Sequence, residues 1–372
     1  MTSSGSGAHI PFKDCTPELC AYEHSYYQYR LWLAPNVVYG SIFAASLLGY
    51  ALVYALTRRR GGLFTLCMVL GLACEIAGYA GRVASWRNQW RAAGFIVQVT
   101  NLTFAPAFLS AAVYLCLRKI VRAFGDANSR IPPAWYARIF IPCDILCLLA
   151  QSGGGTLSAL AVKQRSSTDT GDSIVLVGLS LQVATLLVFI GLVVDFAVRT
   201  YLNSPSALDP HPAMVAVRAS GRFRGFAAAL ALSTVCIFVR CVFRIVEMSG
   251  GYAGPLMARQ DLFVAFEGFM ISVAVLALNL FHPTLCFDSV AAAAMAAAAA
   301  QSAAKSADLK RSISVNSLER DFVGSSLGPG GYDTSSKVSR SSSFDVIYEE
   351  EAYERPINPP GRDLTKRFSK RV

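Results

Sequence analysis

The segment Val37–Leu56 has the sequence VVYGSIFAASLLGYALVYAL and contains no charged residue. About 20 apolar residues in a helix are long enough to cross the hydrocarbon core of a bilayer, which is about 30 Å thick. In hydrocarbon, every peptide group must find its hydrogen-bond partner within the protein. The segment therefore predicts a transmembrane helix.

Six further segments have a similar length and composition. Residues 92–117 are also free of charge and are interrupted only by Gln98, Asn101 and Pro106. The other five predicted spans are residues 63–86, 139–162, 174–198, 225–247 and 262–283. Strands of an outer-membrane barrel would be about 10 residues long and alternate in polarity, a pattern that these segments lack. The sequence predicts an all-α polytopic membrane protein with a seven-transmembrane-helix bundle at residues 36–285.

The overall composition agrees with a chain that meets lipid. Of its 372 residues, 53% are hydrophobic and 16% are charged, and the mean hydropathy is +0.42. Soluble domains carry about 25% charged residues. Collagen-like, disordered and disulfide-stapled classes are excluded for the main body. The net charge of +10 does not indicate nucleic-acid binding, because the basic residues are distributed as in a membrane protein.

The positions of Lys and Arg predict how the bundle is oriented. The connections after the first, third and fifth spans contain 12 of them, whereas the N-terminal segment and the other three connections contain 7. Because cytoplasmic loops hold the excess, we expect the N-terminus outside and the C-terminus in the cytoplasm. Residues 1–35 lack the apolar core of a signal peptide and are predicted to form an extracellular segment. In that oxidising compartment Cys15 and Cys20 are either disulfide-bonded or two free thiols.

Residues 286–372 are predicted to form a cytoplasmic and largely disordered tail. An Ala-rich run at 290–305 favours a helix, and the Ser, Gly, Pro and mixed charge beyond it favour disorder. Arg311 and Arg340 precede serines, so kinases are expected partners of the tail. Cys286, just after the last span, is either a palmitoylation site or an interfacial thiol.

Ionisable residues inside transmembrane helices are costly, so they normally face the bundle interior and pair with one another or serve a pathway. Glu75 and Arg82 share one face of the second span with Gly71 and Gly78, whose small size permits close approach of a neighbouring helix. The predicted spans contain eight acidic or Arg residues, namely Glu75, Arg82, Asp144, Asp195, Arg240, Arg244, Glu247 and Glu267.

The spacing of the other members also predicts shared faces. Arg240, Arg244 and Glu247 share a face of the sixth span, and Arg244 is close enough to pair with Glu247. Asp144 shares a face of the fourth span with Gln151. Asp195, at the cytoplasmic end of its span, is expected to pair with Arg199.

The alternating directions of the spans predict the depth of these residues. Arg82, Arg240, Arg244, Glu247 and Glu267 fall in the outer half of the bundle and Glu75 near the middle. Asp144 falls nearer the cytoplasm. We therefore expect a charged cluster that opens toward the outside, with a second acidic point below it. The alternative is that these residues are structural ion pairs that fix helix register and bind no ligand.

Motifs of several other functional classes are missing from the sequence. It contains no G-x-x-x-x-G-K-[ST], so no nucleotide-driven step is predicted. His9, His24, His211 and His282 are far apart and make no metal-binding pattern. The G-x-S-x-G at 324–328 lies in the Ser- and Gly-rich tail, outside every apolar segment, and no cofactor is predicted. The sequence therefore favours a protein without enzymatic chemistry.

Six runs, one in each span from the second to the seventh, resemble the signature segments of the fungal RTA-like lipid-translocating exporters. They occur in the order of that family and cover about residues 36–284, whereas the tail after residue 288 matches nothing familiar. The runs are EIAGYAGR at 75–82, LTFAPAFLSAAVY at 102–114, DILCLLAQSGGG at 144–155, GLSLQ at 178–182, RCVFRIVE at 240–247 and NLFHP at 279–283.

The resemblance implies a seven-span protein with an external N-terminus that exports sphingoid long-chain bases or similar toxic amphiphiles. Its partners would be a lipid or amphiphilic cargo and the bilayer, and its location the plasma membrane. Glu267 lies where the family often has an acidic residue. The residues that would contact cargo during translocation are Glu75, Arg82, Asp144, Gln151, Arg240, Arg244, Glu247 and Glu267.

An alternative of a different class is a seven-helix sensor of membrane stress that signals through its cytoplasmic tail. G-protein-coupled receptors share this topology. The sequence has Leu117-Arg118-Lys119 where such receptors carry Asp-Arg-Tyr, and it has no Asn-Pro-x-x-Tyr in the last span. The sequence therefore favours the exporter.

Overall fold

The structure is a computed structural model that describes residues 15, 20–22, 25–57, 61–125, 128–164, 166–202, 210–251, 254 and 256–325. The basic loop at 58–60 and the serines after Arg340 lie outside the described residues. The chain divides into two compact units, Met1–Lys305 and Ser306–Val372. The first unit contains the helical bundle.

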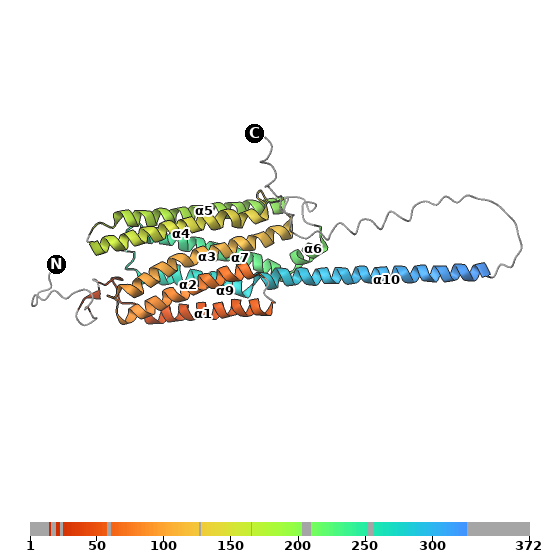
Figure 1. Cartoon of the computed structure of the whole chain (residues 1–372), viewed down its shortest axis with the longest axis horizontal. Coiled ribbons are helices and arrows are strands. Elements are labelled where there is room, and N and C mark those ends of the chain that lie inside the picture. The colour runs from red at the N-terminus through yellow and green to blue at the C-terminus, as the bar shows by residue number, and fades with distance from the viewer. Residues whose placement is uncertain are drawn as a thin grey trace, which may run out of the picture. The chain divides into compact units, whose positions relative to one another are not determined.

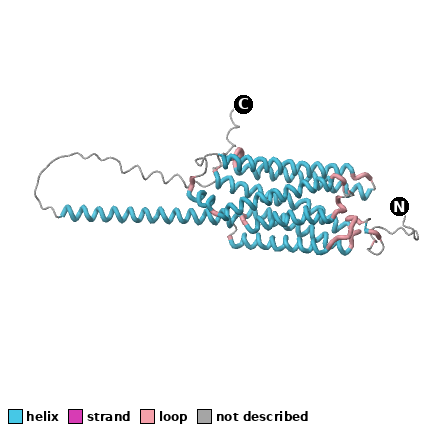
Figure 2. The backbone as a smooth tube through the Cα atoms, turned by 180° about the vertical axis from the view of Figure 1, so that it is seen from behind, coloured by secondary structure: helices cyan, strands magenta, loops and turns pink. Residues whose placement is uncertain are grey.

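The prediction of an all-α, seven-helix membrane protein is confirmed, since seven helices of the described part are long and apolar enough to cross a bilayer. They lie side by side along a common direction (Figures 1 and 2). The first six are α1 (Leu33–Leu56), α2 (Gly62–Arg87), α3 (Ala92–Phe124), α4 (Pro133–Gln164), α5 (Asp169–Leu202) and α7 (Gly221–Met248). The seventh begins with α8 (Gln260–Phe263), the π-helix η5 (Val264–Phe269) and α9 (Met270–Leu280).

Successive helices run in opposite directions, so the connections gather at two ends of the bundle (Figure 1). One end carries residues 25–32 and the connections that follow α2, α4 and α7, and we call it the N-terminal face. The other end carries the connections that follow α1, α3 and α5, and we call it the opposite face. Several helices extend a few residues beyond the predicted spans, mainly at the opposite face.

Three helical segments were not predicted or have different bounds. The short helix α6 (Pro212–Ala219) begins with proline at its first turn, and the His211 side chain accepts a hydrogen bond from the Ala213 N–H. The π-helix η6 (Thr284–Asp288) leads into α10 (Ser289–Ser325). The helix expected at 290–305 is thus longer, and 306–325 are helical where disorder was expected. Extending an existing helix avoids the cost of nucleating a new one.

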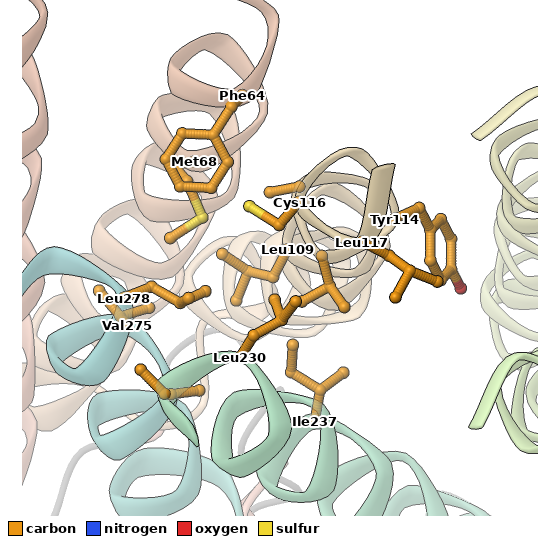
Figure 3. Packing of buried hydrophobic residues seen from close by; sticks show 14 of the residues in the cluster. Phe64, Met68, Leu109, Tyr114, Cys116, Leu117, Leu230, Ile237, Val275 and Leu278 are labelled. Atoms are coloured by element: carbon orange, nitrogen blue, oxygen red, sulfur yellow. The ribbon is translucent and has the colours of Figure 1, made fainter. Parts of the chain in front are cut away.

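The apolar core lies where α2, α3, α7 and α9 meet (Figure 3). Met68, Leu109, Leu230 and Val275, one from each helix, point toward one another and are at most 5% exposed. Tyr114 lies on another side of α3 and points away from this group. The core therefore fixes the rotation of α3, and a polar tyrosine is directed toward a neighbouring helix.

Glycines allow α2 and α3 to pack with their backbones close together, as the sequence predicts. A Cβ atom on Gly71 would lie 2.8 Å from Leu109 Cδ2, and one on Gly78 would lie 2.5 Å from Leu102 Cδ2. Both distances are too short for a real side chain. Gly154 on α4 and Gly171 on α5 make a similar contact, with 2.7 Å from a Gly154 Cβ to the Gly171 carbonyl oxygen.

The structure also bears on the predictions for the N-terminal cysteines, for Asp195 and for Cys286. Cys15 and Cys20 form a disulfide, with 5.6 Å between their Cα atoms. Asp195 forms an ion pair with Arg199 at 3.0 Å, as predicted, and also with Arg130 at 2.8 Å. Cys286 is buried, which argues against palmitoylation.

Candidate functional site

Six ionisable side chains from α2, α7 and η5 form a buried group, which we call the charge cluster. All six face the interior of the bundle and are at most 7% exposed. Burying charge in this way is unfavourable unless each group is compensated. The partners of each member therefore indicate what the cluster can do. The members are Glu75, Arg82, Arg240, Arg244, Glu247 and Glu267.

Arg240 is held by two acceptors, one of which results from a proline. Pro106 lies inside α3 and has no N–H, so the carbonyl of Leu102 four residues earlier lacks its usual helical donor. The Nη2 of Arg240 donates to this Leu102 oxygen and also to Glu267 Oε1. Pro106 thereby provides a buried acceptor that ties α7 to α3 beside the ion pair.

Glu267 reaches Arg240 from the π-helix η5. A π-helical turn contains an extra residue and therefore displaces the side chains that follow it. Tyr39 on α1 donates its hydroxyl proton to the carbonyl of Val264, at the start of this turn, at 3.2 Å. Glu267 is completely buried, and its second oxygen, Oε2, has no hydrogen-bond partner among the described residues.

Arg244 and Glu247 form the second ion pair of the cluster, through Arg244 Nη1 and Glu247 Oε2. They are three residues apart on α7, which places them on the same face. This pairing confirms the prediction from spacing. Unlike the Arg240 and Glu267 pair, it is made within one helix and lies nearer the N-terminal face.

Arg82 has neutral partners. Its Nε donates to Asn36 Oδ1 at 2.7 Å, and its Nη2 donates to the Tyr29 hydroxyl at 3.1 Å. The guanidinium also lies 3.9 Å from the ring centre of Phe263 and 5.6 Å from that of Tyr27. Such contacts stabilise a cation, but none of these partners carries a negative charge.

Glu75 is the least compensated member of the cluster. It is completely buried, and neither of its carboxylate oxygens has a hydrogen-bond partner in the described part of the structure. The hydroxyl of Tyr79, one turn further along α2, is also buried and without a partner there. Arg240 and Glu267 are its charged neighbours, but Arg240 is engaged with Glu267.

Asp144 and Gln151 belong to a second polar group, between α3, α4 and α5, which we call the hydroxyl cluster. Asp144 Oδ2 accepts from Ser110 at 2.6 Å and from Tyr114 at 3.1 Å, and Oδ1 accepts from Thr185 at 3.5 Å. Gln151 donates to Gln182 Oε1 at 3.0 Å. Asp144 is therefore solvated by hydroxyls, and within the described residues it has no ion-pair partner.

Residues 25–32, which precede α1, lie over the charge cluster at the N-terminal face, and we call them the cover. Tyr27 donates to Ser85 at 3.1 Å, and burial raises the pKa of Tyr27 to about 12, so this phenol is neutral at ordinary pH. A cavity of about 20 Å³ remains beneath, lined among others by Arg82, Arg244 and Glu247. This volume holds about one water molecule. The structure thus shows the cluster closed, although the sequence analysis expected it to open at this face.

The structure brings six of the eight predicted residues into one cluster and places Asp144 and Gln151 in another. Neutral side chains that were not predicted surround them, including Asn36, Tyr39, Tyr79 and Gln98. The available signals were Asn36 at the start of the first apolar run and Pro106 four residues after Leu102. The tyrosine-rich stretch at 22–29 was a third signal, for the cover.

Comparison with known proteins identifies a family and several relatives. The family described as RTA1 like protein matches residues 68–290, which is more than half of the chain. The sphingoid long-chain base transporter RSB1 of Saccharomyces cerevisiae (strain Lalvin EC1118) is 28% identical over 248 residues, covering 60% of this chain and 65% of the relative. Protoporphyrin uptake protein 1 of Saccharomyces cerevisiae (strain S288c) is 25% identical over 210 residues, covering 56% of this chain and 65% of the relative.

A third relative, protein RTA1 of the same strain, is 25% identical over 218 residues and covers 58% of this chain. The chain spans about 65% of the length of each of these curated relatives. No solved structure matches the chain at a significant level. From the match to the family over more than half of its length, together with the seven apolar helices, the chain is a multi-pass membrane protein that belongs to the RTA1-like family.

Proposed function

We propose that this chain translocates amphipathic lipids with a cationic headgroup, and that sphingoid long-chain bases are its cargo. It would act in the plasma membrane with the N-terminal face outside, and contribute to lipid asymmetry or to resistance against toxic amphiphiles. No bond chemistry is involved. The name of the relative RSB1 supports the choice of cargo, and the state of Glu75 supports the mechanism.

The observation that carries the proposal is the buried and unpartnered carboxylate of Glu75. A carboxylate in a low-dielectric interior without a partner costs several kcal/mol. The ammonium of a sphingoid base supplies the missing charge and up to three hydrogen bonds. Arg240 and Arg244 pair with Glu267 and Glu247, so these carboxylates do not compete strongly for the cargo.

Translocation requires a second conformation. The cavity at the charge cluster holds about one water molecule, so the cover formed by residues 25–32 must move before a headgroup enters. Glu75 lies near the middle of α2, whereas Asp144 lies in the half of α4 nearer the opposite face. We propose that the ammonium moves between Glu75 and the hydroxyl cluster, where Asp144 and Gln151 would receive it.

The test is the release of labelled sphingoid base from cells that express the wild type or the Glu75→Gln variant. The substitution keeps the shape of the side chain and removes its charge. We expect release to fall about tenfold or more, because a charge-assisted hydrogen bond is worth about 1.5–3 kcal/mol, and Glu75→Asp to retain part of it. Unchanged release at equal surface expression would remove Glu75 from the mechanism.

A deletion separates this proposal from the sensor alternative. Removing residues 290–372 leaves α1 to α9, the charge cluster and the hydroxyl cluster intact. A translocator should then keep its cargo flux. A sensor that signals through its tail should lose its signal on truncation, and neither the full-length nor the truncated protein should carry cargo. Loss of flux in the truncated protein, at equal surface expression, would contradict the proposal.

A further inference from the structure

The charge cluster contains one carboxylate and one guanidinium that are left over after pairing. Its three acids and three arginines form two ion pairs, Arg240 with Glu267 and Arg244 with Glu247. Glu75 and Arg82 have no ion-pair partner among the described residues, and they do not pair with each other. Glu75 and Arg82 are thus the acid and the guanidinium of the cluster that are left outside its ion pairs.

These two charges lie on one face of α2. Seven residues separate them, which corresponds to about 10 Å along the helix axis. Tyr79 lies between them, and its buried hydroxyl has no partner in the described structure. Glu75 is the deeper of the two, whereas Arg82 lines the cavity beneath the cover. From the middle of the bundle outward, the face therefore presents the carboxyl of Glu75, the hydroxyl of Tyr79 and the guanidinium of Arg82.

Each of the two charges is costly in isolation. Arg82 is 1% exposed and its contacts are an amide oxygen, a phenol and aromatic rings. Glu75 has no hydrogen-bond partner among the residues that the structure describes. A single buried charge without a counter-charge destabilises a protein by several kcal/mol. A ligand with one positive and one negative group compensates both at once, which a simple cation cannot do.

We propose that Glu75 and Arg82 together bind a zwitterionic lipid headgroup, with its ammonium at Glu75 and its phosphate at Arg82. This inference rests on the proposed function and extends its substrate class from the free base to amphiphiles that carry both groups. Arginine is suited to this role because its planar guanidinium recognises phosphate through paired hydrogen bonds. Two sources share this chemistry, a sphingoid base phosphate and a single-chain phosphoethanolamine lipid.

The side-chain lengths are compatible with such a ligand. The ammonium and phosphate of these headgroups are only a few bonds apart, so both side chains must bend toward each other from positions two turns apart. The long and flexible Arg82 side chain supplies most of this reach, after it leaves Asn36 and Tyr29.

The experiment compares three labelled cargoes in vesicles that contain only the purified full chain: free sphingoid base, sphingoid base phosphate and single-chain phosphoethanolamine lipid. The variants are Arg82→Gln, Arg82→Lys and Glu75→Gln. In Arg82→Gln, we expect flux of the two phosphate cargoes to fall about ten- to hundredfold, since a charged hydrogen bond is lost. Flux of the free base, which carries no phosphate, should fall less, so the ratio of phosphate flux to base flux should drop. Glu75→Gln should reduce all three.

Control variants separate binding from structural damage. Arg82→Lys keeps the positive charge and should retain part of the phosphate flux. Tyr29→Phe breaks the contact between the cover and Arg82 without changing charge, so the ratio of phosphate flux to base flux should stay as in the wild type. If Tyr29→Phe changes that ratio as much as Arg82→Gln does, Arg82 acts by holding the cover and the proposal is overturned.

The remaining outcomes are also decisive. If the wild type carries free base but neither phosphate cargo, or if Arg82→Gln lowers all three equally, the zwitterion proposal fails while the proposed function stands. If no cargo moves faster than in protein-free vesicles, the proposed function itself fails. Equal flux of the two phosphate cargoes would show that the headgroup alone is recognised. Flux of only one of them would show which lipid, the sphingoid base phosphate or the phosphoethanolamine lipid, is the cargo.

Discussion

Two neighbouring glutamates of the charge cluster show how differently one residue type can be placed. Glu267 and Glu75 are both completely buried, but Glu267 is paired with Arg240 and Glu75 has no hydrogen-bond partner among the described residues. Removing a paired charge leaves its partner uncompensated, whereas removing an unpaired one leaves nothing behind. The two residues should therefore respond in opposite ways to the same substitution.

We expect Glu267→Gln to lower the free energy of unfolding by about 3–5 kcal/mol, because Arg240 loses its counter-charge. Glu75→Gln should leave the stability unchanged or raise it, even though transport is lost, as is common when a functional residue is strained. Thermal unfolding of the purified protein in detergent measures both variants. A similar loss of stability in both would show that Glu75 has a structural partner.

Residue-scale pairs could be predicted from the sequence only where they are local. Arg244 and Glu247 are three residues apart on one helix, so their pairing followed from helical geometry. Arg240 and Glu267 lie on different helices, and their contact depends on the π-helix η5 and on the carbonyl freed by Pro106. The helical rotation and the backbone defects that create such a contact are not visible in residue spacing.

At the scale of elements, the contact between α2 and α3 positions the site. Gly78 lies on α2 between Glu75 and Arg82 and faces Leu102, the residue whose carbonyl holds Arg240. Any side chain at position 78 would displace the Leu102 side chain, next to this acceptor. The close approach of the two helices therefore supports the geometry of the charge cluster as well as the stability of the bundle.

Gly78→Ala should lower the free energy of unfolding by about 1–3 kcal/mol, because the new Cβ would lie 2.5 Å from Leu102 Cδ2. Gly153→Ala on α4 is the matched control, since nothing lies within 4 Å of its added Cβ. This control should be neutral or stabilising by up to about 1 kcal/mol. Thermal unfolding compares the two, and equal stability of Gly78→Ala and the wild type would contradict the packing described here.

The helices themselves were largely predictable, because their length and apolar character are imposed by the bilayer. All seven predicted spans correspond to helices of the structure. The short helix α6 carries no such signal, since eight residues at the end of the bundle need no apolar length. The extension of α10 to residue 325 follows from the cooperativity of helix growth. Judging each Ser and charged position by itself leaves out this cooperativity.

At the scale of the molecule, the bundle holds three acids and three arginines beneath a cover formed by residues before α1. The covered cavity has room for about one water molecule, so the structure corresponds to a closed state of the proposed transport cycle. The orientation in the membrane and the cytoplasmic tail, with its expected kinases, remain predictions from the sequence. The central claim is that this protein moves a cationic amphiphile past Glu75.

The most direct measurement is the flux of labelled sphingoid base across vesicles that contain only the purified protein, with Gly153→Ala as the control variant. The account predicts that the wild type and Gly153→Ala carry the base faster than protein-free vesicles, and that Glu75→Gln reduces this flux about tenfold or more. Equal flux for the wild type and Glu75→Gln, or no flux above the protein-free rate, would contradict it.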